Sequence, residues 1–176
     1  MIRQDDLARA LYAGLCALPT VDAHEHLHAE AMRLGRRVDI FLLFHQYLCT
    51  QLAAAGMPEA DTEALGDEAT PLDRKWASLA PYLDQVRHVG CARPAFAALE
   101  RFFDADDLTA DNYETLTAKM RAHNQPGLFD HCLREACGIT LVLNQNRTMW
   151  QNDLFRPILP EDVFLCPAGL DRKSVV

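Results

Sequence analysis

Apolar residues recur every three or four positions near the start of the chain. Residues 5–18 carry one such repeat, formed by four leucines (Leu7, Leu11, Leu15 and Leu18). That spacing places the leucines on one face of an α-helix. Asp5 and Asp6 lie at the start of the segment, where acidic side chains favour the positive end of the helix dipole, and Pro19 closes it. The pattern predicts an N-terminal helix over 5–18.

The stretch from about 38 to 125 has helical spacing almost throughout. Four helices are predicted in it (39–55, 70–90, 93–103 and 112–123). Thr70 supplies a hydroxyl cap and Pro71 a first-turn proline for the second of them, which Pro81 is expected to kink or split. Residues 57–69 are rich in acidic side chains and are predicted to form an exposed connection. The aromatic residues of the stretch are expected to pack between its helices (Trp76, Tyr82, Phe96, Phe102, Phe103 and Tyr113).

The pattern changes after Pro126. A helix is predicted over 128–137, and the β-branched apolar run 139–143 follows Gly138 at once, as buried parallel strands do. A second apolar run, 163–166, is predicted to be another such strand. Each run ends in polar residues (Asn144 to Arg147, and Asp171 with Arg172). In α/β folds, ligands bind at the carboxyl ends of parallel strands, so these tips are candidate site positions.

Composition limits the class of protein. The 176 residues suffice for one ordinary globular core, and the net charge is −8. A negative chain is a poor partner for nucleic acid or an anionic membrane surface, so we expect a small-molecule substrate and neither of those partners. No apolar run reaches the roughly 18 residues of a membrane span, and the N-terminus lacks the pattern of a signal peptide. Six dispersed cysteines without a secretory signal indicate reduced thiols and a cytoplasmic location. A homo-oligomer is left open.

The chain concentrates metal-ligating groups in one place, residues 20–28. Three histidines and three acidic residues fall within nine positions from Asp22 to Glu30. In a strand, alternate side chains share a face, so Asp22, His24 and His26 would project together. Two imidazoles can share one divalent ion, and a nearby carboxylate can orient a ring. The strand interpretation therefore predicts that His24 and His26 are metal ligands and that the Asp22 carboxylate orients a histidine ring.

The same letters admit a helical alternative. His24, Glu25 and His28 satisfy H-E-x-x-H, which in a zinc peptidase places two histidines one helical turn apart with the glutamate as general base. The backbone of residues 24–28 therefore decides between two kinds of chemistry. In a third interpretation the histidines bind nothing, and the chain is a non-catalytic helical interaction module.

The segment from Val21 to Leu27 resembles the first-strand motif of the amidohydrolase superfamily, an apolar residue followed by Asp-x-His-x-His. The long helical stretch after it resembles the amidohydrolase-related and uronate isomerase-like branches. The resemblance implies an α/β fold: the N-terminal part of a (β/α)8 TIM-type barrel, incomplete in this chain, with a helical insertion over 38–125. Residues 1–176 would then be part of one barrel domain. The remaining ligands and the catalytic groups of such an enzyme are expected beyond Val176.

The resemblance also implies a function. We expect a metal-dependent hydrolase in which a divalent ion, zinc or alternatively iron or manganese, activates water against an amide, ester or related bond. His24 and His26 would hold the ion. The substrate-binding candidates are the polar residues at two strand ends (Asn144, Arg147, Asp171 and Arg172). This chain by itself is expected to be inactive. An aldose–ketose isomerase of the uronate isomerase type is the alternative within the family.

Overall fold

The structure, a computed structural model, describes residues 4–145 and 153–158. The chain divides into two compact units. The sheet unit comprises Met1–Leu34 and Pro126–Val176, and the helical unit comprises Gly35–Gln125. Each unit has its own hydrophobic cluster among the described residues.

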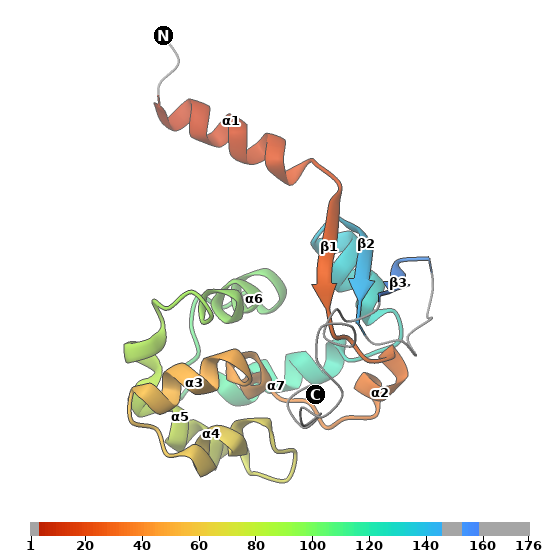
Figure 1. Cartoon of the computed structure of the whole chain (residues 1–176). Coiled ribbons are helices and arrows are strands. Elements are labelled where there is room, and N and C mark those ends of the chain that lie inside the picture. The colour runs from red at the N-terminus through yellow and green to blue at the C-terminus, as the bar shows by residue number, and fades with distance from the viewer. Residues whose placement is uncertain (1–3, 146–152, 159–176) are drawn as a thin grey trace, which may run out of the picture. The chain divides into compact units, whose positions relative to one another are not determined.

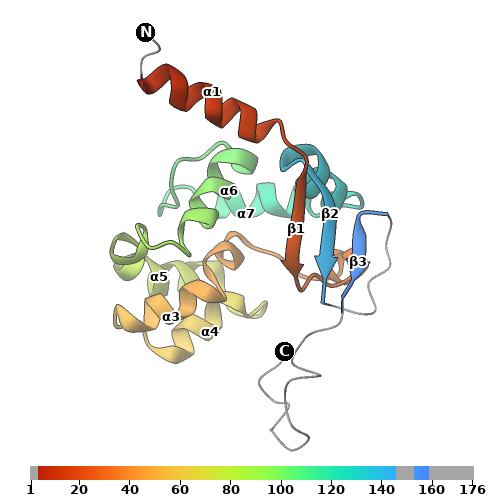
Figure 2. The same cartoon turned by 45° about the horizontal axis from the view of Figure 1, so that its top comes forward.

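The sheet unit contains three parallel strands in the order β1-β2-β3 (Figures 1 and 2). Its elements are six (α1, Gln4–Cys16; β1, Thr20–Glu25; α2, Glu30–Leu34; the π-helix η2, Asp130–Ala136; β2, Ile139–Asn144; β3, Phe155–Pro157). Gly138 lies between η2 and β2 with φ +65°, a left-handed conformation that glycine adopts at no steric cost. That residue lets the chain leave the helix and enter the sheet at once.

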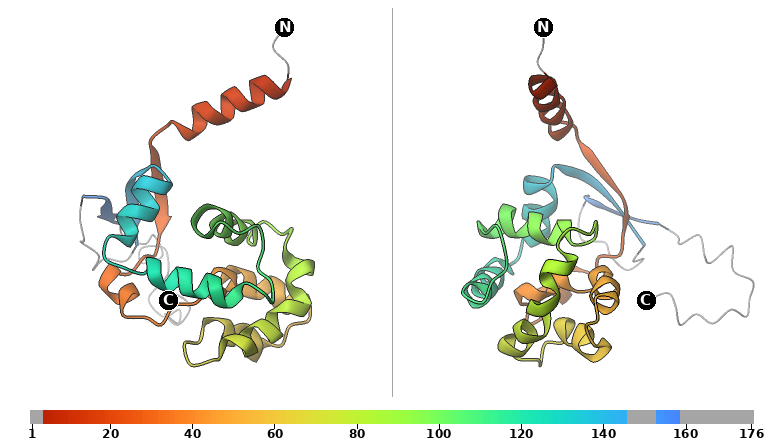
Figure 3. Two further views of the ribbon diagram at one scale, coloured as in Figure 1. Left: turned by 180° about the vertical axis from the view of Figure 1, so that it is seen from behind. Right: turned by 90° about the vertical axis from the view of Figure 1, so that its left-hand side faces the viewer.

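The helix before β2 covers the sheet (Figure 3). Val142 and Phe155 are fully buried, and Phe129 and Leu133 from the helical segment pack against them. Glu30, the first residue of α2, accepts hydrogen bonds from the backbone N–H groups of Gly127 (3.1 Å) and Phe129 (2.8 Å). One carboxylate therefore satisfies two backbone donors at the start of that segment, which would otherwise lack partners.

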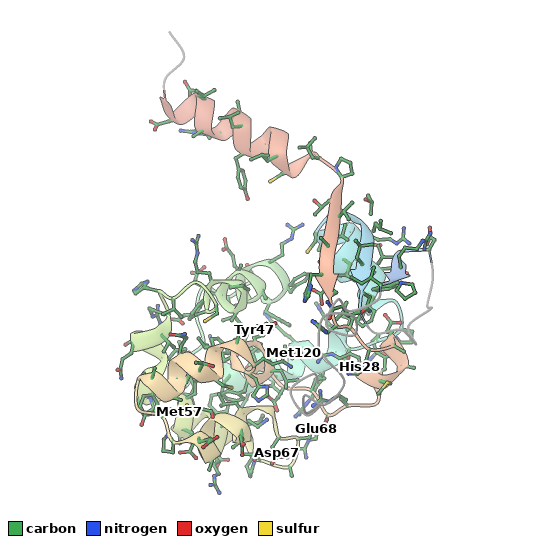
Figure 4. All side chains as sticks on the ribbon, in the orientation of Figure 1. His28, Tyr47, Met57, Asp67, Glu68 and Met120 are labelled. Carbon is green, nitrogen blue, oxygen red and sulfur yellow. The ribbon has the colours of Figure 1, made fainter. Side chains whose placement is uncertain are left out.

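The helical unit consists of short helices around an apolar core. Its elements are six (the 3-10 helix η1, Ile40–Phe44; α3, Tyr47–Ala54; α4, Glu59–Gly66; α5, Leu72–Val86; α6, Arg93–Phe103; α7, Tyr113–His123). All six predicted aromatic residues belong to its core cluster, and Trp76 stacks on Tyr113 with ring centroids 5.7 Å apart. Met57 and Met120, labelled in Figure 4, are buried in the same core. No helix in the described ranges is long and apolar enough to cross a membrane.

A buried ion pair fixes the start of the helical unit. The Lys75 ammonium lies 2.6 Å from the Asp39 carboxylate and donates to the Leu65 carbonyl at 3.0 Å. The other Asp39 oxygen accepts the Phe41 backbone N–H, capping η1. Lys75 is 1% exposed and Asp39 4%, so both charges depend on these partners.

The predicted incomplete TIM-type barrel is wrong for the described residues. Most of them are helical, and their only sheet is the open three-stranded one. A barrel strand is buried on both faces, whereas β1 is an edge strand with no fully buried residue and Val21 is 52% exposed. The helices of Gly35–Gln125 bury their apolar faces against one another. They close their own core.

The strand predictions have mixed outcomes. The strand interpretation of the histidine motif is confirmed as β1, which ends at Glu25. The strand expected over 139–143 is confirmed as β2, in which only Val142 and Asn144 are fully buried. The strand predicted over 163–166 lies outside the described residues. The third strand of the sheet is β3, which the pattern missed because three residues ending in proline show no alternation.

The helix predictions are wrong at several helix boundaries, where local turns determine where each helix begins and ends. The segment 39–55 forms two helices separated at Gln46, whose φ of +63° interrupts the helical conformation. The predicted connection 57–69 contains α4. Thr70 does not cap α5, since its hydroxyl donates to Asp67. Pro81 lies inside α5 without splitting it. Because Pro81 is exposed, the backbone carbonyl that its missing N–H leaves without a partner lies on the solvent side of the helix.

Candidate metal centre

The histidine motif lies at the carboxyl end of β1, where the strand is irregular. Asp22 pairs with Val142 and Glu25 with Asn144, so three residue steps on β1 face two on β2. The extra residue is a β-bulge, a feature that redirects side chains and recurs beside active sites. The simple alternation that predicted one shared face for Asp22 and the histidines is therefore broken between Asp22 and Glu25.

The bulge nevertheless brings the two imidazoles together. The Nε2 atoms of His24 and His26 are 3.0 Å apart, with ring centroids 4.9 Å apart and planes at 69°. Both residues are exposed. The His24 backbone N–H donates to Asp22 Oδ1, and the His26 backbone N–H donates to Glu25 Oε2, each at 3.2 Å. These local bonds hold the backbone on both sides of the converging rings.

The separation of the two nitrogens fits two ligands of one divalent ion. With metal–nitrogen bonds of about 2.0–2.1 Å, two adjacent ligands lie about 2.9 Å apart at a right angle and about 3.4 Å apart at a tetrahedral angle. The 3.0 Å between His24 and His26 is close to the right-angled value. In the absence of metal, the same distance accommodates a hydrogen bond between one protonated and one unprotonated ring nitrogen.

The described part of the chain supplies this pair and no larger set. Among residues 4–145 and 153–158, no group of three or more His, Cys, Asp or Glu side chains is arranged to hold a metal ion. Catalytic zinc sites commonly use three protein ligands and a water. The two histidines are therefore a two-donor site.

The carboxylates of the motif have different roles from the predicted one. Asp22 was expected to orient a histidine ring, but its Oδ1 accepts the His24 backbone N–H. Burial raises the pKa of Glu25, and the negative charge of Asp22 raises it further, while the His26 N–H acts in the opposite direction. The site therefore holds a carboxyl group that retains a proton to higher pH than an ordinary glutamate does.

The side chain beside His24 Nδ1 is Gln145, which the sequence did not single out. Gln145 Nε2 lies 3.4 Å from Nδ1. The oxygen and nitrogen of an amide side chain are assigned from their partners, and the flipped amide would present its oxygen to an Nδ1–H. That arrangement leaves Nε2 unprotonated for a metal. The only sequence signal was the position of Gln145 in the polar run after β2.

The tips of β1 and β2 are bonded to each other. The Gln145 backbone N–H donates to the Glu25 carbonyl, and Asn144 Nδ2 donates to the Leu27 carbonyl, both at 2.8 Å. Asn144 is fully buried, and its side chain contacts the segment that carries the histidines. Its role in substrate binding stays a prediction. The other substrate-binding candidates lie outside the described residues (Arg147, Asp171 and Arg172).

The backbone excludes the helical alternative. His24 and Glu25 belong to β1, residues 26–29 lie in no helix or strand, and α2 begins only at Glu30. H-E-x-x-H requires its two histidines one helical turn apart. The zinc-peptidase arrangement of His24 and His28 is therefore wrong.

No protein-family model matches the chain, and neither the curated proteins nor the solved structures yield a match. None of these comparisons supports the expected resemblance to the amidohydrolase superfamily, which was drawn from the Asp-x-His-x-His motif and the helical stretch after it.

Proposed function

We propose that His24 and His26 bind one divalent metal ion, and that this ion serves a hydrolase of the amidohydrolase type. The observation that carries the proposal is the 3.0 Å between the two Nε2 atoms, in the motif whose spacing suggested it. The exposure of both rings supports it as well, because a metal and a small substrate can reach them from solvent. Zinc suits imidazole ligands, and iron and manganese are the alternatives.

A bound ion of this kind lowers the pKa of its water and polarises a substrate carbonyl. The residues of the chain have separate tasks around it. His24 and His26 would hold the ion, and the Gln145 side chain lies 3.4 Å from His24 Nδ1, where a flipped amide would fix the ring tautomer. Asp22 and Glu25 hold the backbone of the two ligands. Glu25 would place a carboxyl group beside the metal, where it could accept a proton.

Metal titration of the dialysed protein tests the ligand assignment. We expect calorimetry to detect weak, exchangeable Zn²⁺ binding, because two imidazoles are a minimal ligand set. His24→Ala and His26→Ala should each abolish it. His28→Ala is the matched control, since His28 lies two residues further on and belongs only to the excluded helical arrangement. Equal affinity in all four proteins, or a loss confined to His28→Ala, would refute the assignment.

Water activation is tested separately with Co²⁺ in place of zinc. A metal-bound water that ionises near neutrality, at a pKa of about 7, should change the visible absorption of the cobalt protein between about pH 6 and 9. The same titration of the His26→Ala protein provides the control. A cobalt spectrum that depends on His24 and His26 but does not change with pH would leave a metal site and refute its hydrolytic role.

A further inference from the structure

The two-histidine site lies on an open edge of the sheet. β1 pairs with β2 on one side, and among the described residues no strand pairs with its other side. The imidazoles of His24 and His26 are exposed at the carboxyl end of this edge strand. A metal held there faces solvent, and half or more of its coordination positions remain for groups from outside the described chain.

At the histidine end of β1, two backbone N–H groups are not available for pairing with another chain. An unpaired strand normally offers its N–H groups to a second strand. Here the N–H groups of His24 and His26 already donate to Asp22 and Glu25. The side chains are what the end of the strand still presents, and the imidazole nitrogens are its strongest metal donors.

We infer that one divalent ion joins two copies of this chain, each contributing His24 and His26. The inference deepens the proposed function by naming the partner that completes the site. Each pair has a nearly right-angled spacing, which is the angle between adjacent ligands of a six-coordinate ion. Two pairs provide four nitrogen ligands and leave two positions for water and substrate. Copies with a charge of −8, and acidic Asp22 and Glu25 beside each pair, repel one another without the ion, and its two positive charges reduce that repulsion at the contact.

The experiment is the mass of the whole chain by light scattering, with Zn²⁺ or Mn²⁺ added stepwise after chelation. We expect a monomer without metal and, as metal is added, a dimer whose bound metal saturates at half an equivalent per chain. His24→Ala and His26→Ala should stay monomeric, and His28→Ala should dimerise as the original chain does. Circular dichroism of each variant verifies that its helices are intact.

The other outcomes separate this inference from the proposed function. One equivalent of metal bound to a monomer through both histidines would overturn the metal-bridged dimer and leave the metal site standing. A dimer that forms equally in chelator would also overturn it. No metal binding at all would refute both. A mixture of the original chain with a size-tagged His24→Ala/His26→Ala chain provides a second measurement, in which tagged heterodimers at half an equivalent would contradict the inference.

Discussion

Among single residues, Lys75 has the most demanding position. Its ammonium group is buried in the helical unit and joins α5 to Asp39 before η1 and to the last turn of α4. A buried charge is tolerated only with partners that replace water. Asp39 depends on Lys75 in the same way, because its side chain is buried too.

Removing the ammonium should therefore destabilise the helical unit strongly. We expect Lys75→Ala to cost about 3–5 kcal/mol of unfolding free energy, since it leaves the Asp39 carboxylate buried without its counter-charge. Arg74→Ala, on the exposed face of the same helical turn, should stay within about 0.5 kcal/mol. Urea unfolding followed by Trp76 fluorescence measures both, in a Trp150→Phe background that leaves Trp76 as the sole tryptophan. A loss below about 1 kcal/mol for Lys75→Ala would show that Asp39 finds another partner.

His45 gives the helical unit a dependence on pH. Burial lowers the pKa of His45, and the positive charges of Lys75 and Arg36 lower it further. As the pH falls through the ordinary value of about 6.5, the unfolded chain takes up a proton that the folded state excludes. Stability contributed by neutral His45 should therefore be present at higher pH and be lost on acidification. His45→Gln should reduce the change of the urea midpoint with pH between about pH 5 and 7, and the exposed His88→Gln should not. Equal slopes would contradict this assignment.

The proximity of His24 and His26 was predictable from local sequence, but the residues around them were not. The Asp-x-His-x-His spacing placed both histidines on one strand face, and their Nε2 atoms do lie 3.0 Å apart, although the strand is irregular between Asp22 and Glu25. Gln145 is 121 positions from His24 and reaches it only through the pairing of β2 with β1. The bulge that moves Asp22 onto the backbone depends on the same pairing, which no local pattern encodes.

At the scale of elements, the short helices were harder to predict than the long ones. The limits of α6 coincide with the predicted helix 93–103, because its apolar positions repeat regularly between clear ends. α4 was missed because acidic residues and Gly66 resemble a connection. Only its packing identifies it as a helix: Leu65 is fully buried, and Gly66 lies against the ring of His45. Asp67 and Glu68 follow it in the true connection to α5 (Figure 4).

The end of α4 provides a sharp test of that packing. A Cβ atom on Gly66 would lie 2.7 Å from the His45 ring, closer than van der Waals contact allows. We expect Gly66→Ala to destabilise the helical unit by about 1–3 kcal/mol through this overlap. Gly90→Ala meets nothing within 4 Å and is the matched control. Recovery of stability in the double variant Gly66→Ala/His45→Ala would identify the clash as the cause. A neutral Gly66→Ala, by thermal melting, would show that the ring of His45, at the end of η1, moves away freely.

At the scale of the whole molecule, the sequence pattern did not predict how the helices and strands are divided between two compact units. Apolar strands followed by polar tips occur in open sheets as in closed barrels, and the number of strands is not a local property. The chain uses most of its described residues in the helical unit, whose buried core residues run from Val38 to Met120. Among residues 4–145 and 153–158, the three-stranded sheet has no further strand at its edges and is covered by the π-helix η2.

This division predicts that the helical unit folds without the rest. The segment Gly35–Gln125 is continuous and contains every residue of its own core cluster. A chain shortened to 35–125 should show helical circular dichroism and one cooperative melting transition, because its contacts are mostly local. The shortened Lys75→Ala chain is the control and should melt lower. Gradual melting of the unaltered segment would show that the unit depends on the sheet unit.

The most direct test of the central claim is X-ray absorption at the zinc edge, on the protein loaded with less than half an equivalent of Zn²⁺. His24 and His26 as ligands predict imidazole nitrogens at about 2.0–2.1 Å, with the outer-shell scattering of rings, lost in the His24→Ala and His26→Ala proteins. The chain also contains six cysteines, which compete for zinc as thiolates. Sulfur at about 2.3 Å, or a spectrum unchanged in both variants, would contradict the account.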